Sequence, residues 1–131
     1  MPAPIVLISN QRIKPDMLEA YKSNYARAVE RFISGWPRTL AHAAYLGEDT
    51  AQVSVVMAFA DAEAMEAHLR GLGDAPRRAQ ESMDFISLQI YGSPTEAALD
   101  LICTRIAPGV PMTIMPSAIA GYIRGGPDAP Q

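Results

Sequence analysis

The chain has 131 residues, of which 49% are hydrophobic and 19% charged, and its formal net charge is −3. This composition predicts one compact domain and excludes a disordered chain. The eleven Lys and Arg residues are scattered, and only Arg77 and Arg78 are adjacent in the sequence. Neither a nucleic acid nor a membrane is therefore expected as a partner.

No segment approaches the roughly 20 apolar residues of a membrane span, and the first residues lack the pattern of a signal peptide. Cys103 is the only cysteine, so an intrachain disulfide is impossible. These features fit a reducing compartment, and we expect a cytoplasmic protein.

Short apolar segments typical of β-strands occupy residues 4–10, 38–45, 52–59 and 85–91. Helical spacing predicts a helix over residues 16–34 and helical sequence over 61–82, which Gly71 and Gly73 interrupt. The order β-α-β-β-α-β predicts the α+β class, with a ferredoxin-like antiparallel sheet.

The chain continues beyond the fourth strand. Ser93, Pro94 and Glu96 are typical of a helix start, and the spacing predicts a helix as far as Ile106. A short strand or arm is expected around residues 112–115. We interpret residues 1–92 as a ferredoxin-like domain and residues 93–131 as a helix and arm that extend it.

Alternate residues of a strand point to opposite faces, which divides the strands into two sets of side chains. The bulky set is Ile5, Leu7, Leu40, Val53, Val55, Met57, Phe59, Ile86, Leu88 and Ile90. The small or polar set is Val6, Ile8, Asn10, Ala41, Ala43, Tyr45, Ser54, Val56, Ala58, Ser87, Gln89 and Tyr91. Because one helix layer covers only one face, we expect the bulky set to pack on a second copy and form a homodimer through the sheet faces.

The small set is then expected beneath the helices, where it would line a pocket for a small apolar or aromatic molecule. The alternative is a solid core in which alanines let the helices pack close to the sheet.

Two polar residues are the candidate catalytic groups. His68 shares an apolar helix face and could act as a base, an acid or an orienting donor, or simply bond a backbone carbonyl. Asn10 could donate to an oxyanion or cap a loop. The candidate substrate-binding residues are Tyr25, Phe32, Tyr45, Ser54, Met65 and Tyr91. His42 falls in the bulky set and is expected at the subunit interface.

The sequence lacks the residue patterns of several common types of functional site. A single Cys and two distant His residues give no zinc-ligand spacing, and no phosphate loop, dinucleotide fingerprint or nucleophile elbow is present. We expect neither a metal nor an organic cofactor.

Two segments resemble the antibiotic-biosynthesis-monooxygenase superfamily of dimeric α+β barrels, over about residues 4–91. The sequence Ile5-Val-Leu-Ile-Ser-Asn10, followed by Lys14-Pro15, resembles the first strand of that family. The sequence Phe59-Ala-Asp-Ala-Glu-Ala-Met-Glu-Ala-His-Leu69 resembles the exit of its third strand and its second helix.

The resemblance implies a homodimer joined through its sheets, with a ligand pocket between helices and sheet in each subunit. The family includes cofactor-independent oxygenases of polycyclic aromatic or quinol substrates, haem-degrading enzymes and proteins of unknown activity. Haem degradation is not implied, because Phe59 stands where that branch has tryptophan and residues 77–80 lack its histidine.

Two functions remain open. The protein is either a cofactor-independent monooxygenase that oxidises a small phenol or quinol, or a non-catalytic dimeric module that binds a small molecule or serves as a scaffold.

Overall fold

The computed structural model describes residues 3–124. Its strands are β1 (Ile5–Ile13), β2 (Thr39–Leu46), β3 (Gln52–Phe59), β4 (Met83–Tyr91) and β5 (Met112–Met115). Its helices are α1 (Leu18–Gly35), α2 (Ala62–Gly71), α3 (Ala75–Ala79), α4 (Glu96–Leu101) and the π-helix η1 (Ile102–Ile106). The predicted α+β class and β-α-β-β-α-β order are confirmed, together with the C-terminal helix and strand.

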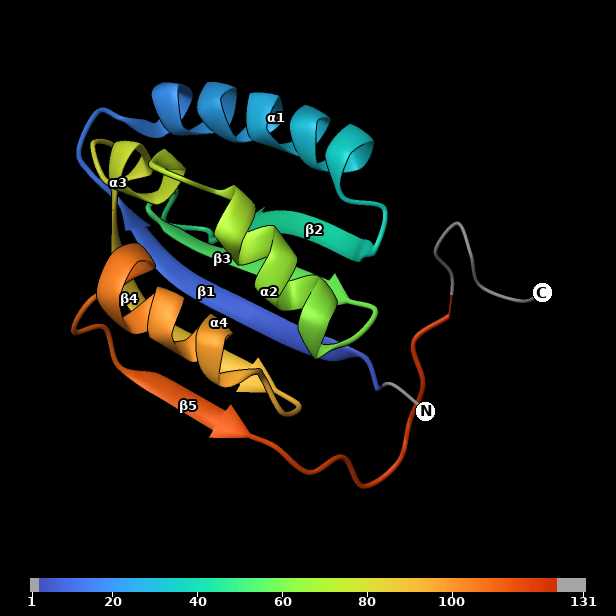
Figure 1. Ribbon diagram of the computed structural model, residues 1–131. Coiled ribbons are helices and arrows are strands. Elements are labelled where there is room, and N and C mark those ends of the chain that lie inside the picture. The colour runs from blue at the N-terminus through green and yellow to red at the C-terminus, as the bar shows by residue number, and fades with distance from the viewer. Residues whose placement is uncertain (1–2, 125–131) are drawn as a thin grey trace.

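The five strands form one sheet in the order β2-β3-β1-β4-β5. The pairs among β1 to β4 are antiparallel, whereas β5 runs parallel to β4. The helices lie on one side of this sheet, and α4 packs beside α2 (Figure 1). Within residues 3–124, no helix has the length and apolar character needed to cross a membrane.

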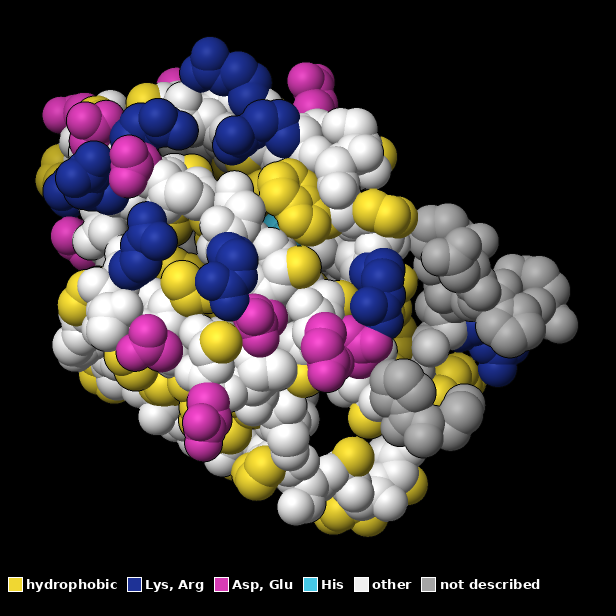
Figure 2. All heavy atoms as spheres, in the orientation of Figure 1, with side chains coloured by type: hydrophobic (Ala, Val, Ile, Leu, Met, Phe, Trp, Pro, Cys, Tyr) yellow, Lys and Arg dark blue, Asp and Glu magenta, His cyan; other side chains and the backbone are white. Residues whose placement is uncertain are grey.

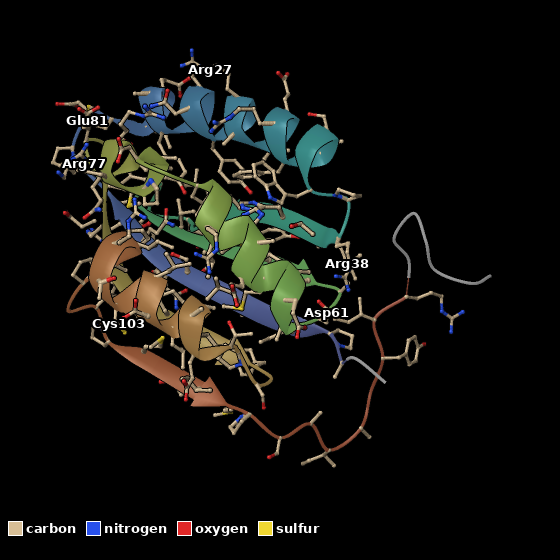
Figure 3. All side chains as sticks on the ribbon, viewed as in Figure 1. Arg27, Arg38, Asp61, Arg77, Glu81 and Cys103 are labelled. Carbon is tan, nitrogen blue, oxygen red and sulfur yellow. The ribbon has the colours of Figure 1, made fainter. Side chains whose placement is uncertain are left out.

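The helix starts follow local side-chain chemistry. Asp61 caps α2, since its carboxylate accepts a hydrogen bond of 2.8 Å from the N–H of Ala64. Arg38 pairs with the same carboxylate and so ties the start of β2 to α2 (Figure 3). By contrast, α1 begins two residues after Asp16, whose φ of 64° makes it a turn residue.

The expected assignment of the sheet faces is wrong. Bulky residues face the helices, and Ile5, Leu7, Val55 and Phe59 are all buried within one subunit. Burial of such side chains is the main driving force of folding. The bulky face is therefore buried against the helices of its own subunit. Ile86 is an exception, because a register shift between β1 and β4 leaves it outside the pairing and half exposed.

The small and polar set lies on the opposite, open face of the sheet. Asn10 is the centre of a hydrogen-bond network there. Its carbonyl accepts from the Ser54 hydroxyl at 2.7 Å, and its amide donates to Ser87 at 3.0 Å and Gln89 at 3.2 Å. These bonds join β1 to both neighbouring strands on the face that no helix of residues 3–124 covers.

A close contact joins the end of α1 to the end of α2. Trp36 follows α1, and its indole lies against the backbone of Gly71. A Cβ atom at Gly71 would stand only 2.2 Å from Cζ2 of Trp36, so glycine is what permits this approach. Trp36 in turn packs edge-on against Phe32 and His68, with ring centroids 6.0 and 5.8 Å away.

The variant Gly71→Ala is expected to push Trp36 out of this position and to lower the free energy of unfolding by about 1–3 kcal/mol, the usual range for overpacking. Trp36 is the only tryptophan, so its emission spectrum reports the displacement directly during urea unfolding. Gly35→Ala is the control, because a Cβ there meets nothing within 4 Å. Equal emission and stability in both variants would contradict the prediction.

Candidate functional site

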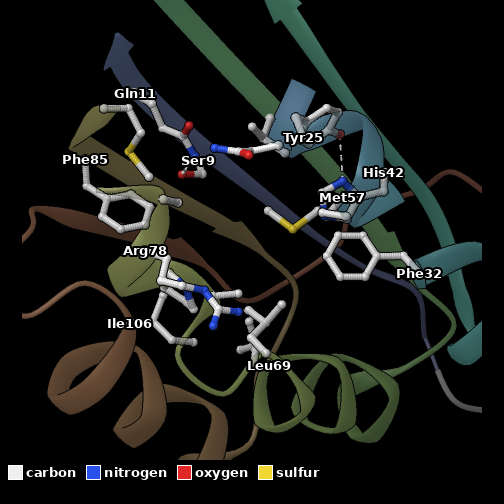
Figure 4. Close-up of a pocket in the computed structure, with 18 of the residues that line it drawn as sticks. Ser9, Gln11, Tyr25, Phe32, His42, Met57, Leu69, Arg78, Phe85 and Ile106 are labelled. Carbon is white, nitrogen blue, oxygen red and sulfur yellow. Dashed lines mark hydrogen bonds between the residues drawn. The ribbon is translucent and has the colours of Figure 1, made fainter. Parts of the chain in front are cut away.

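A cavity of about 750 Å³ lies between the sheet and the helices. Its walls come from α1, α2, α3 and η1 and from the first four strands (Figure 4). Apolar side chains dominate, among them Leu7, Met57, Leu69, Leu88 and Ile106. A histidine is just visible in the hollow between α1 and α2, on the side where the cavity opens (Figure 2). This volume suits a molecule of two or three fused rings.

The cavity exists because α1 is anchored to the molecule near its two ends. Tyr21 and Phe32 are its only buried residues. They are eleven positions apart, three turns along one face of the helix. Between them lie Tyr25 and Ala28, which line the cavity without filling it. The middle of α1 thus roofs the cavity.

A chain of hydrogen bonds forms one polar wall. The Tyr21 hydroxyl donates to Oε1 of Gln11 at 2.7 Å, and Nε2 of Gln11 donates to the Ser9 hydroxyl at 2.9 Å. All three residues are buried. Burial raises the pKa of Tyr21 to about 12, so its hydroxyl remains a donor. With its acceptor site occupied by Gln11, Ser9 keeps its own hydroxyl proton free to donate.

Two imidazole rings form the other polar wall. His42 on β2 and His68 on α2 have ring centroids 5.5 Å apart, and the Phe32 ring lies within 4.7 Å of both. The pKa of each histidine is lowered to about 4, by burial for His68 and by burial together with the nearby His68 for His42. Both rings are therefore neutral at pH 7.

Each imidazole is oriented by a hydroxyl. Tyr25 lies 2.7 Å from Nδ1 of His42 (Figure 4), and burial, followed by the nearby Tyr21 and Tyr45, raises the Tyr25 pKa. Tyr25 keeps its proton, and when it donates that proton to Nδ1, the hydrogen of His42 resides on Nε2.

For His68 the orienting hydroxyl is that of Thr39, 3.1 Å from Nδ1, and it can accept a hydrogen bond when Nδ1 carries the ring hydrogen. The Nε2 atom of His68 is buried and has no hydrogen-bond partner among residues 3–124. A buried polar atom without a partner costs free energy, so it marks a position where a ligand group could bind. His68 is 1% exposed and lies in the cavity wall.

The predicted site residues divide between the two faces of the sheet. His68, Tyr25 and Phe32 line the cavity, whereas Met65 is fully buried and absent from its lining. Asn10, Ser54 and Tyr91 are on the open face, and Tyr45 is 64% exposed on β2, the strand at the sheet edge. Asn10 and His68 therefore do not share one cavity.

His42, Ser9, Gln11 and Tyr21 complete the cavity and are absent from the predicted site. His42 was expected at a subunit interface with the rest of the bulky set, but it faces the helices together with that set. The signal was present in the alternation of β1, since Ser9 and Gln11 continue the series of Ile5 and Leu7.

No protein-family model and no curated protein sequence matches the chain significantly. Solved structures do match. MupZ from Pseudomonas fluorescens has a TM-score of 0.70 and 18% identity, over 92% of this chain and 95% of that one. SnoaB from Streptomyces nogalater, described as a cofactor-independent oxygenase, has a TM-score of 0.59 and 14% identity, over 71% of this chain and 95% of that one.

A candidate antibiotic biosynthesis monooxygenase from Bacteroides thetaiotaomicron matches over 67% of this chain and 85% of that one, with a TM-score of 0.58 and 19% identity. The chain therefore has the fold of the antibiotic-biosynthesis-monooxygenase-like proteins. At these identities the likeness concerns the fold alone.

The buried His68 and the partly buried His42 predict a loss of stability in weak acid. Between pH 6.5 and 4 the unfolded chain binds protons at His42 and His68 that the folded chain does not. The free energy of unfolding therefore decreases as the pH is lowered through this window. We expect a loss on the order of 3 kcal/mol from His68 alone, at about 1.4 kcal/mol per pKa unit.

Urea unfolding at pH 7.5, 6.0 and 4.5 measures this loss. The variant His68→Gln cannot titrate and is expected to lose markedly less stability than the wild type over the same interval. An identical pH dependence in both proteins would contradict the assignment.

Proposed function

We propose that the protein is a cofactor-independent monooxygenase that oxidises a small aromatic phenol or quinol in the cavity beneath α1. The observation that carries the proposal is the buried, unpartnered Nε2 of His68 in the wall of a large apolar cavity. The cofactor-independent oxygenase SnoaB, which has the same fold, adds support.

His68 is the proposed base. Its lowered pKa keeps the imidazole unprotonated throughout the physiological range, so Nε2 is free to accept a proton when Nδ1 donates to Thr39. A pKa of about 4 makes His68 a weak base before substrate binds. A substrate anion formed beside the imidazolium raises this pKa, because opposite charges attract strongly where water is excluded.

The proposed donors to the developing oxyanion are His42 and Ser9. With Tyr25 as the donor to Nδ1, His42 carries its hydrogen on Nε2, and Gln11 leaves the Ser9 proton free. Donors held in place before the reaction stabilise a forming negative charge without having to reorganise.

The electrons come from the substrate itself. The deprotonated carbon of an anthrone or a naphthoquinol passes one electron to O₂, and the resulting radical pair combines into a peroxide. Loss of water from the peroxide leaves a carbonyl, so that one oxygen atom enters the product and the other leaves as water. The chain has to supply only a base, a donor and dry walls.

Oxygen consumption with a panel of anthrones and naphthoquinols tests this proposal. His68→Gln is expected to lower the rate at least about 100-fold, the usual contribution of a general base. Cys103→Ser is the control, because Cys103 is exposed and absent from the cavity lining. Equal rates in wild type and His68→Gln would exclude catalysis by His68.

The second candidate function is non-catalytic binding of a small apolar molecule in the same cavity. The low basicity of both histidines favours it, since imidazoles with a pKa of about 4 are ordinary hydrogen-bonding groups. Tight binding of the panel compounds without oxygen consumption by any protein would select this function.

We also propose a homodimer joined through the open sheet faces. No described helix covers this face (Figure 1), and apolar side chains such as Val6, Ile8 and Val56 surround the Asn10 network. Apolar surface of this kind on a sheet typically marks an interface.

The arm of residues 116–124 supports the same proposal. It leaves β5 and runs past the end of the sheet (Figure 1), with Ile119 fully exposed and Tyr122 80% exposed. A second subunit on the open face would offer these side chains an apolar surface.

Sedimentation at micromolar concentration tests the dimer. Val56 pairs with Ile8 at the centre of the open face. The variant Val56→Asp is expected to yield monomers, because a dimer would bury the new charge without a partner. Ile33→Asp is the matched control on α1, where the side chain is 76% exposed. A monomeric wild type would end the proposal.

A further inference from the structure

Most cationic side chains of this protein either form ion pairs or line the cavity. Six of the eleven Lys and Arg residues form ion pairs. The five without a carboxylate within 4.0 Å, among residues 3–124, are Arg27, Arg31, Arg78, Arg105 and Arg124. Three of these five, Arg27, Arg31 and Arg78, line the cavity.

The same lining contains two acidic residues, Glu30 and Glu81, and neither pairs with an arginine within 4.0 Å. Basic side chains are gathered on the α1 and α3 side of the molecule, with acidic ones among them (Figure 2). The charged lining therefore carries one net positive charge in a protein whose total charge is −3. The mouth is thus suited to a monoanion rather than to a multiply charged group.

Arg78 differs from the other two arginines in its position. It projects from α3 into the cavity, near Leu69 and Ile106 (Figure 4). Arg27, by comparison, donates to Asn24 on its own helix at 2.8 Å. Arg78 forms no side-chain hydrogen bond to another described residue, so its planar fork of donors is available.

We propose that the ligand of this cavity is a carboxylic acid, whose carboxylate is bound by Arg78 at the mouth while its apolar ring system fills the interior. A carboxylate matches the guanidinium fork with two parallel hydrogen bonds and carries the single charge that the lining balances. The inner walls hold only neutral polar groups, the imidazoles and the chain of Tyr21, Gln11 and Ser9, so they suit the uncharged part of the molecule.

This inference deepens the proposed function, since it rests on the cavity as the ligand site. It assigns Arg78 a role in selecting and orienting the substrate, distinct from proton transfer at His68. With the acid held at the mouth, the far end of the ring system is directed toward the imidazole pair.

Two ligands test the proposal without requiring turnover: anthraquinone-2-carboxylate and the uncharged anthraquinone-2-carboxamide. Their binding is measured by the quenching of Trp36 fluorescence. The wild type is expected to bind the acid about tenfold more tightly than the amide, the low end for a charge-assisted pair near solvent. Arg78→Gln is expected to abolish this difference while leaving the affinity for the amide unchanged.

Arg77→Gln is the matched control. Arg77 is the neighbouring residue on α3, but it pairs with Asp74 and does not line the cavity (Figure 3 shows it beside Glu81 at that end of the molecule). The proposal is overturned by equal affinities for acid and amide in the wild type, by the absence of binding of either, or by equal effects of the two substitutions. Acid-selective binding without oxygen consumption would instead uphold the proposal and reject the oxygenase.

Discussion

The two-point attachment of α1 determines most of what is distinctive in this molecule. Tyr21 and Phe32 hold the helix near its ends, and each does so with a ring that also belongs to the cavity wall. Tyr21 bonds Gln11 on β1, whereas Phe32 packs against both histidines. The anchors therefore fix the helix and shape the site at once. If either were shortened, α1 could settle onto the sheet and the cavity would collapse, because an apolar void is costly to maintain.

The same arrangement explains why the imidazoles are neutral. Aromatic rings surround them, with Phe32 packed against both His42 and His68, and with Trp36 and Phe59 within 5.8 Å of His68. An ion would lose its hydration there without gaining a counter-ion, so the uncharged form is favoured. The hydroxyls of Tyr25 and Thr39 then determine how the two neutral rings are oriented. The aromatic surroundings and the orientation of the rings thus have one cause, which is the packing of α1 over the sheet.

Much of the fold could be predicted from the sequence, because local patterns carry it. Residues 52–59 were predicted as a strand with the observed bounds, and Gly71 and Gly73 marked the break between α2 and α3. The faces could not be assigned by the same means. Alternation separates Leu7 from Ile8, but it does not say which of the two meets the helices. The expectation that small residues create a pocket led to the wrong face, whereas the volume comes from the way α1 is held. His68 and Tyr25 were found because helical spacing places them on the inner side, while Ser9 and Gln11 were missed because the face of β1 was reversed.

The two faces of the sheet carry different features. The helix side carries the cavity, with neutral polar groups inside and arginines at its mouth. The open side carries the Asn10 network, whose donors and acceptors bond one another across β1, β3 and β4. Polar groups bonded to one another in this way can be covered at lower cost than unpaired ones, and the surrounding Val6, Ile8 and Val56 gain from burial. A partner on the open face would leave the cavity walls of each subunit intact. The strands link the two sides mechanically, because any change in the pairing of β1 would move Ser9 and Gln11 on one face together with Asn10 on the other.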